Sequence, residues 1–500
     1  MNNLIEFGSQ IIIFSAALLL FLLGAFFIVV IYMYFVDITQ TTHTVRRNYP
    51  VIGRFRYLFE HAGEFFRQYF FALDREELPF NRALRSWVYR AAKNIDTTIA
   101  FGSTRPLNQP GDTIFLNDFR PIMSHELEPP TTLTLGEGFA KKPFTTNALL
   151  NISGMSYGAL SGPAVHALSH GAAKAGIWMN TGEGGLSKYH LEGGCDIVFQ
   201  IGTAKYGVRD NAGKLSDEKL RQIAEHTQVR MFEIKLSQGA KPGKGGILPA
   251  AKVSAEIAKI RGIAKNSDSI SPNGHEEVNS VEDLLDLIFR VRRVTGKPCG
   301  FKAVIGQSEW LDELCIAINE QGLEYAPDFI TIDSADGGTG AAPQALMDYV
   351  GLPIQRSLPL VIDKITQHGL RDRIKINCSG KMITPSGVAW ALCTGADFVS
   401  SARGFMFALG CIQALQCNKN TCPTGITTHN KKLQNGLVAS DKTERVANYA
   451  SNIVKETSTI AHSCGVKNPR KLQRKHAQII DEMGLPVNLA DAFPETAPKR

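Results

Sequence analysis

Residues 398–425, FVSSARGFMFALGCIQALQCNKNTCPTG, contain the features from which the rest of the chain can be interpreted. A short strand-like run, FVSSA, leads into an apolar helical pattern, and Cys411, Cys417 and Cys422 follow with the spacing C-x5-C-x4-C. Three thiolates this close together in a long chain favour iron–sulfur ligation over a disulfide framework, and three ligands suit a three-iron cluster. The alternative interpretation is that they are small buried hydrophobic residues.

Seven further strand-like runs precede this one, and longer helical patterns separate them. They are NALLNIS (147–153), IWMNT (177–181), DIVFQI (196–201), MFEIKL (231–236), CGFKAVI (299–305), DFITID (328–333) and IKINC (374–378). Eight short strands alternating with helices predict an α/β fold, a (β/α)8 TIM barrel.

Nearly every predicted strand ends in glycine, serine or charged residues. The loops concerned are 154–161, 180–185, 238–246 and 333–340, together with Ser379-Gly380 and residues 401–404. Each could be an ordinary turn, but barrel enzymes build their sites at this end of the strands, so together they predict a binding site. The last two each precede a helix, which is typical of a phosphate cradle. The glycine-rich loop 238–246 is long enough to act as a lid.

Residues 11–36, IIIFSAALLLFLLGAFFIVVIYMYFV, carry no charge and exceed the length that a helix needs to cross a bilayer. The first ten residues lack Lys and Arg, so we expect a single-pass anchor rather than a signal peptide. Arg46, Arg47, Arg54 and Arg56 follow the span and predict that the catalytic body is cytoplasmic. A buried core helix is the alternative.

These patterns predict five segments. They are a tail (1–10), a transmembrane helix (11–36), a small helical and irregular cap region near the membrane (37–145), the barrel with its cysteine motif (146–465) and a C-terminal extension (466–500).

The composition excludes one class of partner. The formal net charge of +7 is small for 500 residues, and no run of basic residues interleaved with aromatic residues occurs, so nucleic acid is not an expected ligand. The other six cysteines are scattered singly, which indicates a reducing compartment.

The chain resembles a known family, the flavin-binding synthase domain of glutamate synthase. The matching motifs, in family order, are MSYGALS (155–161), NTGEGG (180–185), QGAKPGKGG (238–246), FKAV (301–304), DGGTGAAP (336–343) and GCIQALQCNKNTCPTG (410–425). The resemblance covers residues from about 143 to 464 and implies a barrel that holds FMN and a 3Fe-4S cluster.

The resemblance implies roles for individual residues. Cys411, Cys417 and Cys422 would bind the cluster. The flavin would be contacted by Met155, Ser156, Gly158, Ala159, Lys302, Gly337, Gly338, Ser379, Gly380, Ala402, Arg403 and Gly404. Gln238, Lys241, Arg261 and Glu183 would hold 2-oxoglutarate or its imine. Independently, a dicarboxylate in a dry site needs cationic anchors, which Lys241 and Arg261 can supply unless they are solvated surface charges.

The sequence also departs from the family. Ala342 stands for a usual Ser, Cys378-Ser379-Gly380 for Asp-Gly-Gly, Lys244 for an acidic residue, and residues 272–275 for a Pro/His-rich segment. Full-length glutamate synthases carry a glutaminase domain and a β-helical domain that do not match here, and the chain resembles the stand-alone, membrane-anchored members of the family. We therefore expect ammonia from outside this chain or from a separate subunit.

The leading hypothesis is therefore a glutamate synthase-like oxidoreductase acting on CH-NH2 donors, which reductively aminates 2-oxoglutarate or a similar dicarboxylate. No G-x-G-x-x-G fingerprint is present, so we expect a ferredoxin-like or membrane electron donor. A second hypothesis keeps the cofactors but assigns another amine, keto acid or hydroxy acid. A third is a non-catalytic, membrane-anchored barrel scaffold.

Overall fold

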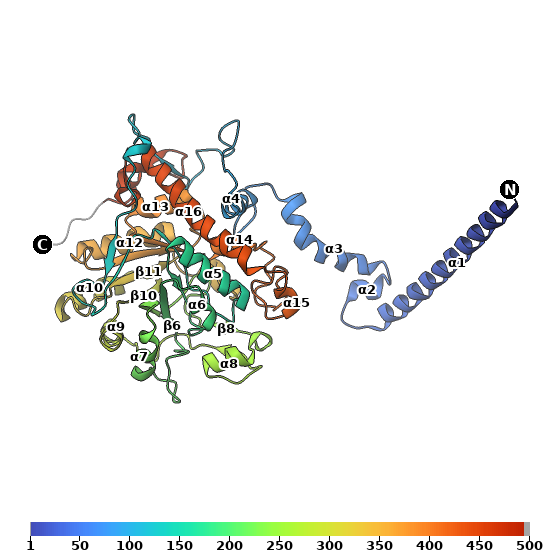
Figure 1. Ribbon diagram of the computed structural model, residues 1–500, viewed down its shortest axis with the longest axis horizontal. Coiled ribbons are helices and arrows are strands. Elements are labelled where there is room, and N and C mark those ends of the chain that lie inside the picture. Colours follow the sequence, from blue (N-terminus) through green and yellow to red (C-terminus); the bar gives the residue numbers. More distant parts are fainter. Residues whose placement is uncertain (1, 495–500) are drawn as a thin grey trace. The chain divides into compact units, whose positions relative to one another are not determined.

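A computed structural model describes residues 2–494. It separates into two compact units, divided in the sequence between Arg82 and Ala83. The barrel lies in the second unit, where helices surround a ring of strands (Figure 1).

Eight parallel strands close into a barrel, in the order β4-β5-β6-β7-β10-β11-β12-β13 and back to β4. Their bounds are β4 Leu150–Ile152, β5 Met179–Asn180, β6 Ile197–Ile201, β7 Val229–Lys235, β10 Cys299–Val304, β11 Phe329–Asp333, β12 Lys375–Ser379 and β13 Phe398–Ser401. Each strand overlaps one of the eight runs expected from the sequence, with β7 beginning two residues before its run and β12 ending one residue after its run, so the TIM-barrel prediction is confirmed. The ring closes where Val399 pairs with Leu150.

Helices follow most barrel strands. They are α5 Gly162–Ala175, α6 Lys188–Glu192, α7 Asp217–Glu225, α8 Ala255–Arg261, α9 Val281–Thr295, α10 Glu309–Gln321, α11 Gln344–Tyr349, α12 Ile354–Gln367, α13 Pro385–Thr394 and α14 Arg403–Leu409, with α15 Lys431–Gln434, α16 Ala439–Ser463 and α17 Leu489–Ala492 towards the C-terminus. The sequence sets their ends: α5 begins after Ser161, whose hydroxyl accepts from the Ala164 N–H, and ends at left-handed Gly176. The long helix α16 packs against α5 and α13 (Figure 1).

Short elements close the amino-terminal end of the barrel and flank it. Strands β2 (Leu133–Leu135) and β3 (Phe144–Thr146) form a hairpin, and β1 (Thr113–Phe115), β14 (Ala477–Ile480) and β15 (Pro486–Asn488) form an antiparallel sheet. Strands β8 (Ile247–Leu248) and β9 (Ser269–Ile270) pair within the connection from β7 to β10. The remaining short helical turns are η2 Ser124–Glu126, η3 Ala250–Lys252, η4 Pro469–Lys471 and η5 Arg474–His476.

The hairpin supplies side chains to the floor of the barrel. Leu135 and Phe144 pack with residues from five barrel strands or their edges, namely Trp178, Val198, Met231, Phe329 and Phe398. These apolar side chains are excluded from water and contribute to closing that end of the barrel.

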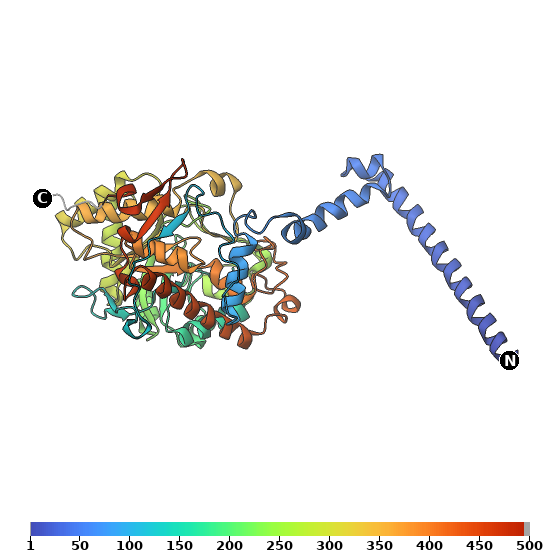
Figure 2. The same ribbon diagram turned by 90° about the horizontal axis from the view of Figure 1, so that it is seen from above.

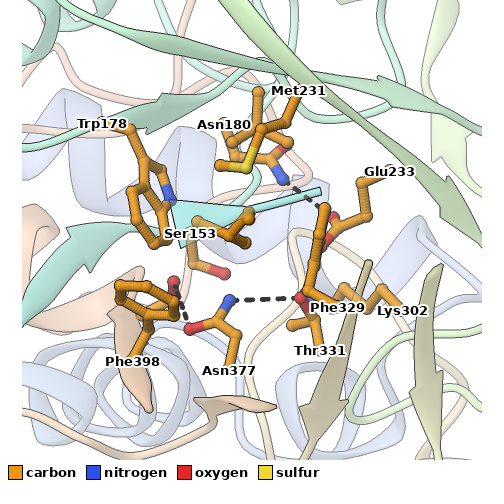
Figure 3. Close-up of a pocket in the computed structure, with 13 residues that line it drawn as sticks. Ser153, Trp178, Asn180, Met231, Glu233, Lys302, Phe329, Thr331, Asn377 and Phe398 are labelled. Carbon is orange, nitrogen blue, oxygen red and sulfur yellow. Dashed lines mark hydrogen bonds between the residues drawn. The ribbon is translucent and has the colours of Figure 1, made fainter. Parts of the chain in front are cut away.

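A polar layer lies above this floor (Figure 3). The buried carboxylate of Glu233 accepts hydrogen bonds from Asn180 (2.8 Å), Gln200 (2.7 Å) and Thr331 (2.6 Å). Asn377 donates to the Thr331 hydroxyl at 3.1 Å. Because buried polar groups are costly unless paired, this layer helps to fix the register of five strands, β5, β6, β7, β11 and β12.

The first unit contains α1 (Asn2–Thr39), α2 (Thr44–Asn48), α3 (Gly53–Phe66) and the π-helical turn η1 (Arg67–Phe71), and α4 (Arg82–Ala92) begins at its end. Helix α1 is exposed along its apolar length and is long and apolar enough to cross a bilayer, a test that a signal sequence also passes.

Candidate active site

A cavity lies at the carboxyl ends of the barrel strands. It is lined by Ser153, Gly154, Gln200, Lys235, Gln238, Lys302, Asp333, Gly338, Ser379, Gly380, Lys381, Ile383, Ser401, Ala402 and Arg403. Seven of the expected site residues are in this lining: Gln238, Lys302, Gly338, Ser379, Gly380, Ala402 and Arg403. This is the end of the barrel at which the sequence predicted a site.

Lys302, on β10, forms a buried ion pair inside the cavity. Its Nζ lies 3.0 Å from Oδ2 of Asp333 on β11, and the same oxygen accepts from the Gly239 N–H at 3.0 Å. Burial opposes the charge of Lys302, but Asp333 and then Glu233 outweigh it and raise its pKa. The ammonium group is therefore held charged beside the cavity.

A second ion pair joins Glu183, which follows β5, to Lys235 at the end of β7. Lys235 Nζ lies 2.8 Å from Glu183 Oε1 and also donates to Oε1 of Gln238, whose amide donates to Thr339 at 2.8 Å. Burial disfavours the Glu183 carboxylate, but Lys235, then Lys241 and Arg261, hold its pKa below the ordinary value. Glu183 is thus an ionised acceptor among three cations.

Lys241 lies in the loop after β7 and is almost fully buried. Burial, reinforced by the charge of Lys235, lowers its pKa from 10.5 to about 8. Such a lysine can both bind an anion and release a proton near neutral pH.

Arg261 ends α8 and is also buried. Its guanidinium donates to Ser269 at 2.9 Å and to Ser156 at 3.4 Å, and it lies over the Tyr206 ring at 5.1 Å. Burial lowers its pKa. Its Nε has no hydrogen-bond partner within residues 2–494, so one buried donor remains to be satisfied.

Close backbone approaches shape the side of the cavity near β12. Gly380 has φ +112°, and a Cβ there would collide with Ser334, so only glycine fits. Beside it, Arg403 is half-buried, donates to the Asp336 carbonyl at 3.2 Å, and has its pKa lowered by burial to about 10. Lys381 pairs with Asp336 at 2.6 Å.

The remaining expected residues lie outside this lining. Met155, Ser156, Gly158 and Ala159 form the loop after β4, next to Arg261, while Gly337 packs against Gly239. Gly404 faces Tyr449, because a Cβ on it would meet the Tyr449 hydroxyl.

The three cysteines share one loop after α14. Burial raises the pKa of Cys411 to about 12, with the charges of Cys417 and Cys422 adding to the rise. Gln413 and Leu415, within this loop, have φ of +57° and +54°, which is a costly conformation for residues other than glycine. Among the residues that the structure describes, no three His, Cys, Asp or Glu side chains converge on a single ion.

Three charged residues of this region were not among the residues expected to act. Glu233 and Lys235 alternate on β7 and both point inward, a signal available in the sequence as two charges two positions apart in an apolar strand. Lys252 is buried between two loops, donating to the carbonyls of Ala159 (2.7 Å) and Cys417 (3.2 Å). Nothing in the local pattern of Lys252 indicated that contact.

Comparison with known proteins gives the family. Residues 120–467 match the family described as the conserved region in glutamate synthase. A glutamate synthase large subunit-like protein, YerD, from Bacillus subtilis is 39% identical over 95% of this chain and 97% of its own length. The archaeal glutamate synthase [NADPH] of Methanocaldococcus jannaschii is 34% identical over 64% of this chain, which spans 60% of that protein.

A solved structure of a mandelate oxidase mutant with benzaldehyde covers 79% of this chain, with a TM-score of 0.47 and 12% identity. A similarity that distant says nothing about the reaction. The family match covers residues 120–467, and YerD is 39% identical over 95% of this chain. This chain therefore belongs to the family defined by the conserved region of glutamate synthase.

Proposed function

We propose that this chain is an FMN- and iron–sulfur-dependent oxidoreductase of glutamate synthase type, which reductively aminates 2-oxoglutarate with ammonia supplied from outside the chain. The observation that carries the proposal is the buried group of Lys235, Lys241, Arg261 and Glu183 beside a cavity at the carboxyl end of the barrel. Membership of the family supports an oxidoreductase in general terms.

The cavity fits FMN in the chemistry of its lining. Gly338 and Gly380 present backbone rather than side chains in the lining, and Lys302 supplies a fixed positive charge. Arg403 is a half-buried guanidinium, and a phosphate beside it would be bound through charge-assisted hydrogen bonds. FMN bound there would supply hydride-transfer chemistry, with Lys302 stabilising negative charge on the reduced ring.

The dicarboxylate would be held by the neighbouring cations. Arg261 has a buried Nε to donate, and Lys241 has a buried ammonium group, so each can bind one carboxylate through charge-assisted hydrogen bonds. Gln238 and ionised Glu183 remain to orient the nitrogen of an imine. Overall, 2-oxoglutarate, ammonium, two electrons and two protons give glutamate and water. A lysine with a pKa of about 8 is suited to deliver one of those protons.

The cysteine loop would supply the ligands of the proposed cluster. Cys411, Cys417 and Cys422 lie within one loop after α14, and a 3Fe-4S cluster takes three thiolates, each on a different iron. Lys252 joins this loop to the loop after β4, so a 3Fe-4S cluster would lie beside the flavin site.

Electrons would come from a ferredoxin-like protein or a membrane carrier, since the chain lacks a dinucleotide fingerprint. Helix α1 would anchor the protein as a single-pass membrane protein, with the barrel in the cytoplasm, because four arginines follow it. Ammonia would arrive free or from a separate subunit.

One observation favours a second candidate, the oxidation of another amine, keto acid or hydroxy acid. Lys244 is exposed at a position where the resemblance implied an acidic residue, and its charge lowers the pKa of Lys241. The electrostatics beside the substrate site therefore differ from those that the family pattern leads one to expect.

An anaerobic assay separates the candidates. Detergent-purified protein reduced with a viologen dye should reoxidise its flavin only when 2-oxoglutarate and ammonium are both present, and glutamine should not replace ammonium. Reduction of the oxidised flavin by an amine or hydroxy acid, without turnover of 2-oxoglutarate, would support the second candidate. If the purified protein contains neither flavin nor iron, that result would favour the third hypothesis, a non-catalytic membrane-anchored scaffold.

A further inference from the structure

We propose that α3 and η1 form a lipid-docking surface, which lies along the membrane face where α1 emerges. The proposal rests on the membrane anchoring proposed above, and it adds a second, separate contact with the bilayer. The occupant is the headgroup and upper acyl region of an anionic bilayer.

Helix α3 has one exposed apolar face. Phe55, Leu58, Phe59 and Phe66 recur three, four and seven positions apart, so they share one side of the helix, and Phe59 is 67% exposed. The rings of Phe55 and Phe59 stack with centroids 6.2 Å apart. Exposed aromatic side chains arranged in this way are unusual on a water-facing surface.

The face continues at both ends. Beyond α3, Phe70 and Phe71 in η1 are 72% and 76% exposed, and Leu73 follows. Before α3, the turn that leads from α2 exposes Tyr49 and Ile52. The surface is therefore continuous along the chain with the segment just after the apolar helix, where aromatic residues favour a membrane interface.

The opposite face of α3 is charged. Arg56, Glu60 and Glu64 are exposed there, and Arg47 and Arg67 are exposed beside the two ends of the helix. A helix with an apolar face and flanking arginines is suited to lie in the plane of a membrane whose headgroups are anionic.

A buried ion cluster fixes α3 to the end of α1. Asp37, the first charged residue after the apolar stretch, is fully buried and lies 2.8 Å from both Arg46 and Arg54. It also accepts the Val51 N–H at 3.0 Å. Figures 1 and 2 show that the chain bends between the end of α1 and the start of α3, with α2 in between. If α1 crosses the bilayer, Asp37 marks its boundary and α3 starts at that boundary.

Tryptophan placed on each face tests the proposal in the full chain. Phe59→Trp puts a tryptophan on the proposed docking face, and the matched control, Glu60→Trp, puts one on the opposite face of the same helix turn. Both variants are reconstituted in vesicles of phosphatidylcholine and phosphatidylglycerol, with and without bromine on the acyl chains. An alkaline carbonate wash of the same vesicles reports anchoring by α1.

We expect both variants to resist carbonate, bromolipid to quench most of the emission added by Phe59→Trp, and the emission added by Glu60→Trp to be unaffected. Resistance to carbonate with equal quenching in the two variants would overturn the docking surface while the anchor stands. Blue-shifted Phe59→Trp emission without quenching would also overturn it, because the face would then be covered by protein. Release by carbonate would remove the anchor and, with it, the docking proposal.

Discussion

Replacing Lys241 by methionine should separate two effects of its buried charge. The charge destabilises the folded protein, and it is proposed to bind the dicarboxylate substrate. The pKa of Lys241 falls from 10.5 to about 8, so at about 1.4 kcal/mol per pKa unit the charged side chain destabilises the folded protein by roughly 3 kcal/mol. Because the folded-state pKa is depressed, this cost is complete below pH 8 and disappears above 10.5. We therefore expect Lys241→Met to unfold several degrees higher than the parent at pH 7, with the difference vanishing at high pH.

The same change should weaken dicarboxylate binding. A charge-assisted hydrogen bond contributes about 1.5–3 kcal/mol, so the Kd for 2-oxoglutarate should rise about 10- to 100-fold, measured by flavin absorbance under anaerobic conditions. In the parent, the Kd should rise once the pH exceeds about 8, where free Lys241 loses its proton.

Lys244→Met is the matched control, because Lys244 is exposed in the same loop and its charge lowers the pKa of Lys241. It should raise the melting temperature at pH 7 by much less than Lys241→Met does, because Lys244 is the smallest of the causes that lower the pKa of Lys241, and it should extend dicarboxylate binding to higher pH. Parent-like affinity in Lys241→Met would refute the role of Lys241 in substrate binding, and a lower melting temperature at pH 7 would refute the buried-charge reasoning.

Three further changes test the cofactor sites. Cys417→Ser should abolish the iron signal in electron paramagnetic resonance and keep the flavin, whereas Cys315→Ser, a buried cysteine on α10, should keep both. Lys302→Met leaves its buried aspartate partner unpaired and should cost about 3–5 kcal/mol of unfolding free energy in denaturant titrations, with loss of flavin. Gly380→Ala should lower flavin content at purification, because its Cβ would collide with Ser334; Gly369→Ala, also at positive φ but in open space, should retain flavin.

The barrel could be predicted because its signal is local. Each strand is a short apolar run that ends in glycine or charge, and caps such as Ser161 and Gly176 mark where the helices begin and end. The same rule identified Ser379 and Gly380 at the end of a strand, the family resemblance added Lys302, and all three line the cavity.

The ion pairs of the candidate site could not be predicted, because they depend on which strand ends become neighbours in the closed barrel. Asp333 could not be assigned to Lys302, nor Glu183 to Lys235, until the barrel closed, because each pair joins segments that are separate in sequence. Gly404 follows the last strand as expected, yet the packing of α16 directs it towards Tyr449. That orientation is a tertiary effect with no local signal.

The pairing of β1 with β14 determines when their sheet can form during synthesis. Residues 113–115 hydrogen-bond with residues 477–479, so that sheet cannot form until nearly the whole chain has left the ribosome. At about 5–20 residues per second, β1 waits roughly 20–70 s for its partner, while the barrel strands between them already exist. Stalling or truncation before residue 477 would thus leave an exposed strand edge, which is a site for aggregation.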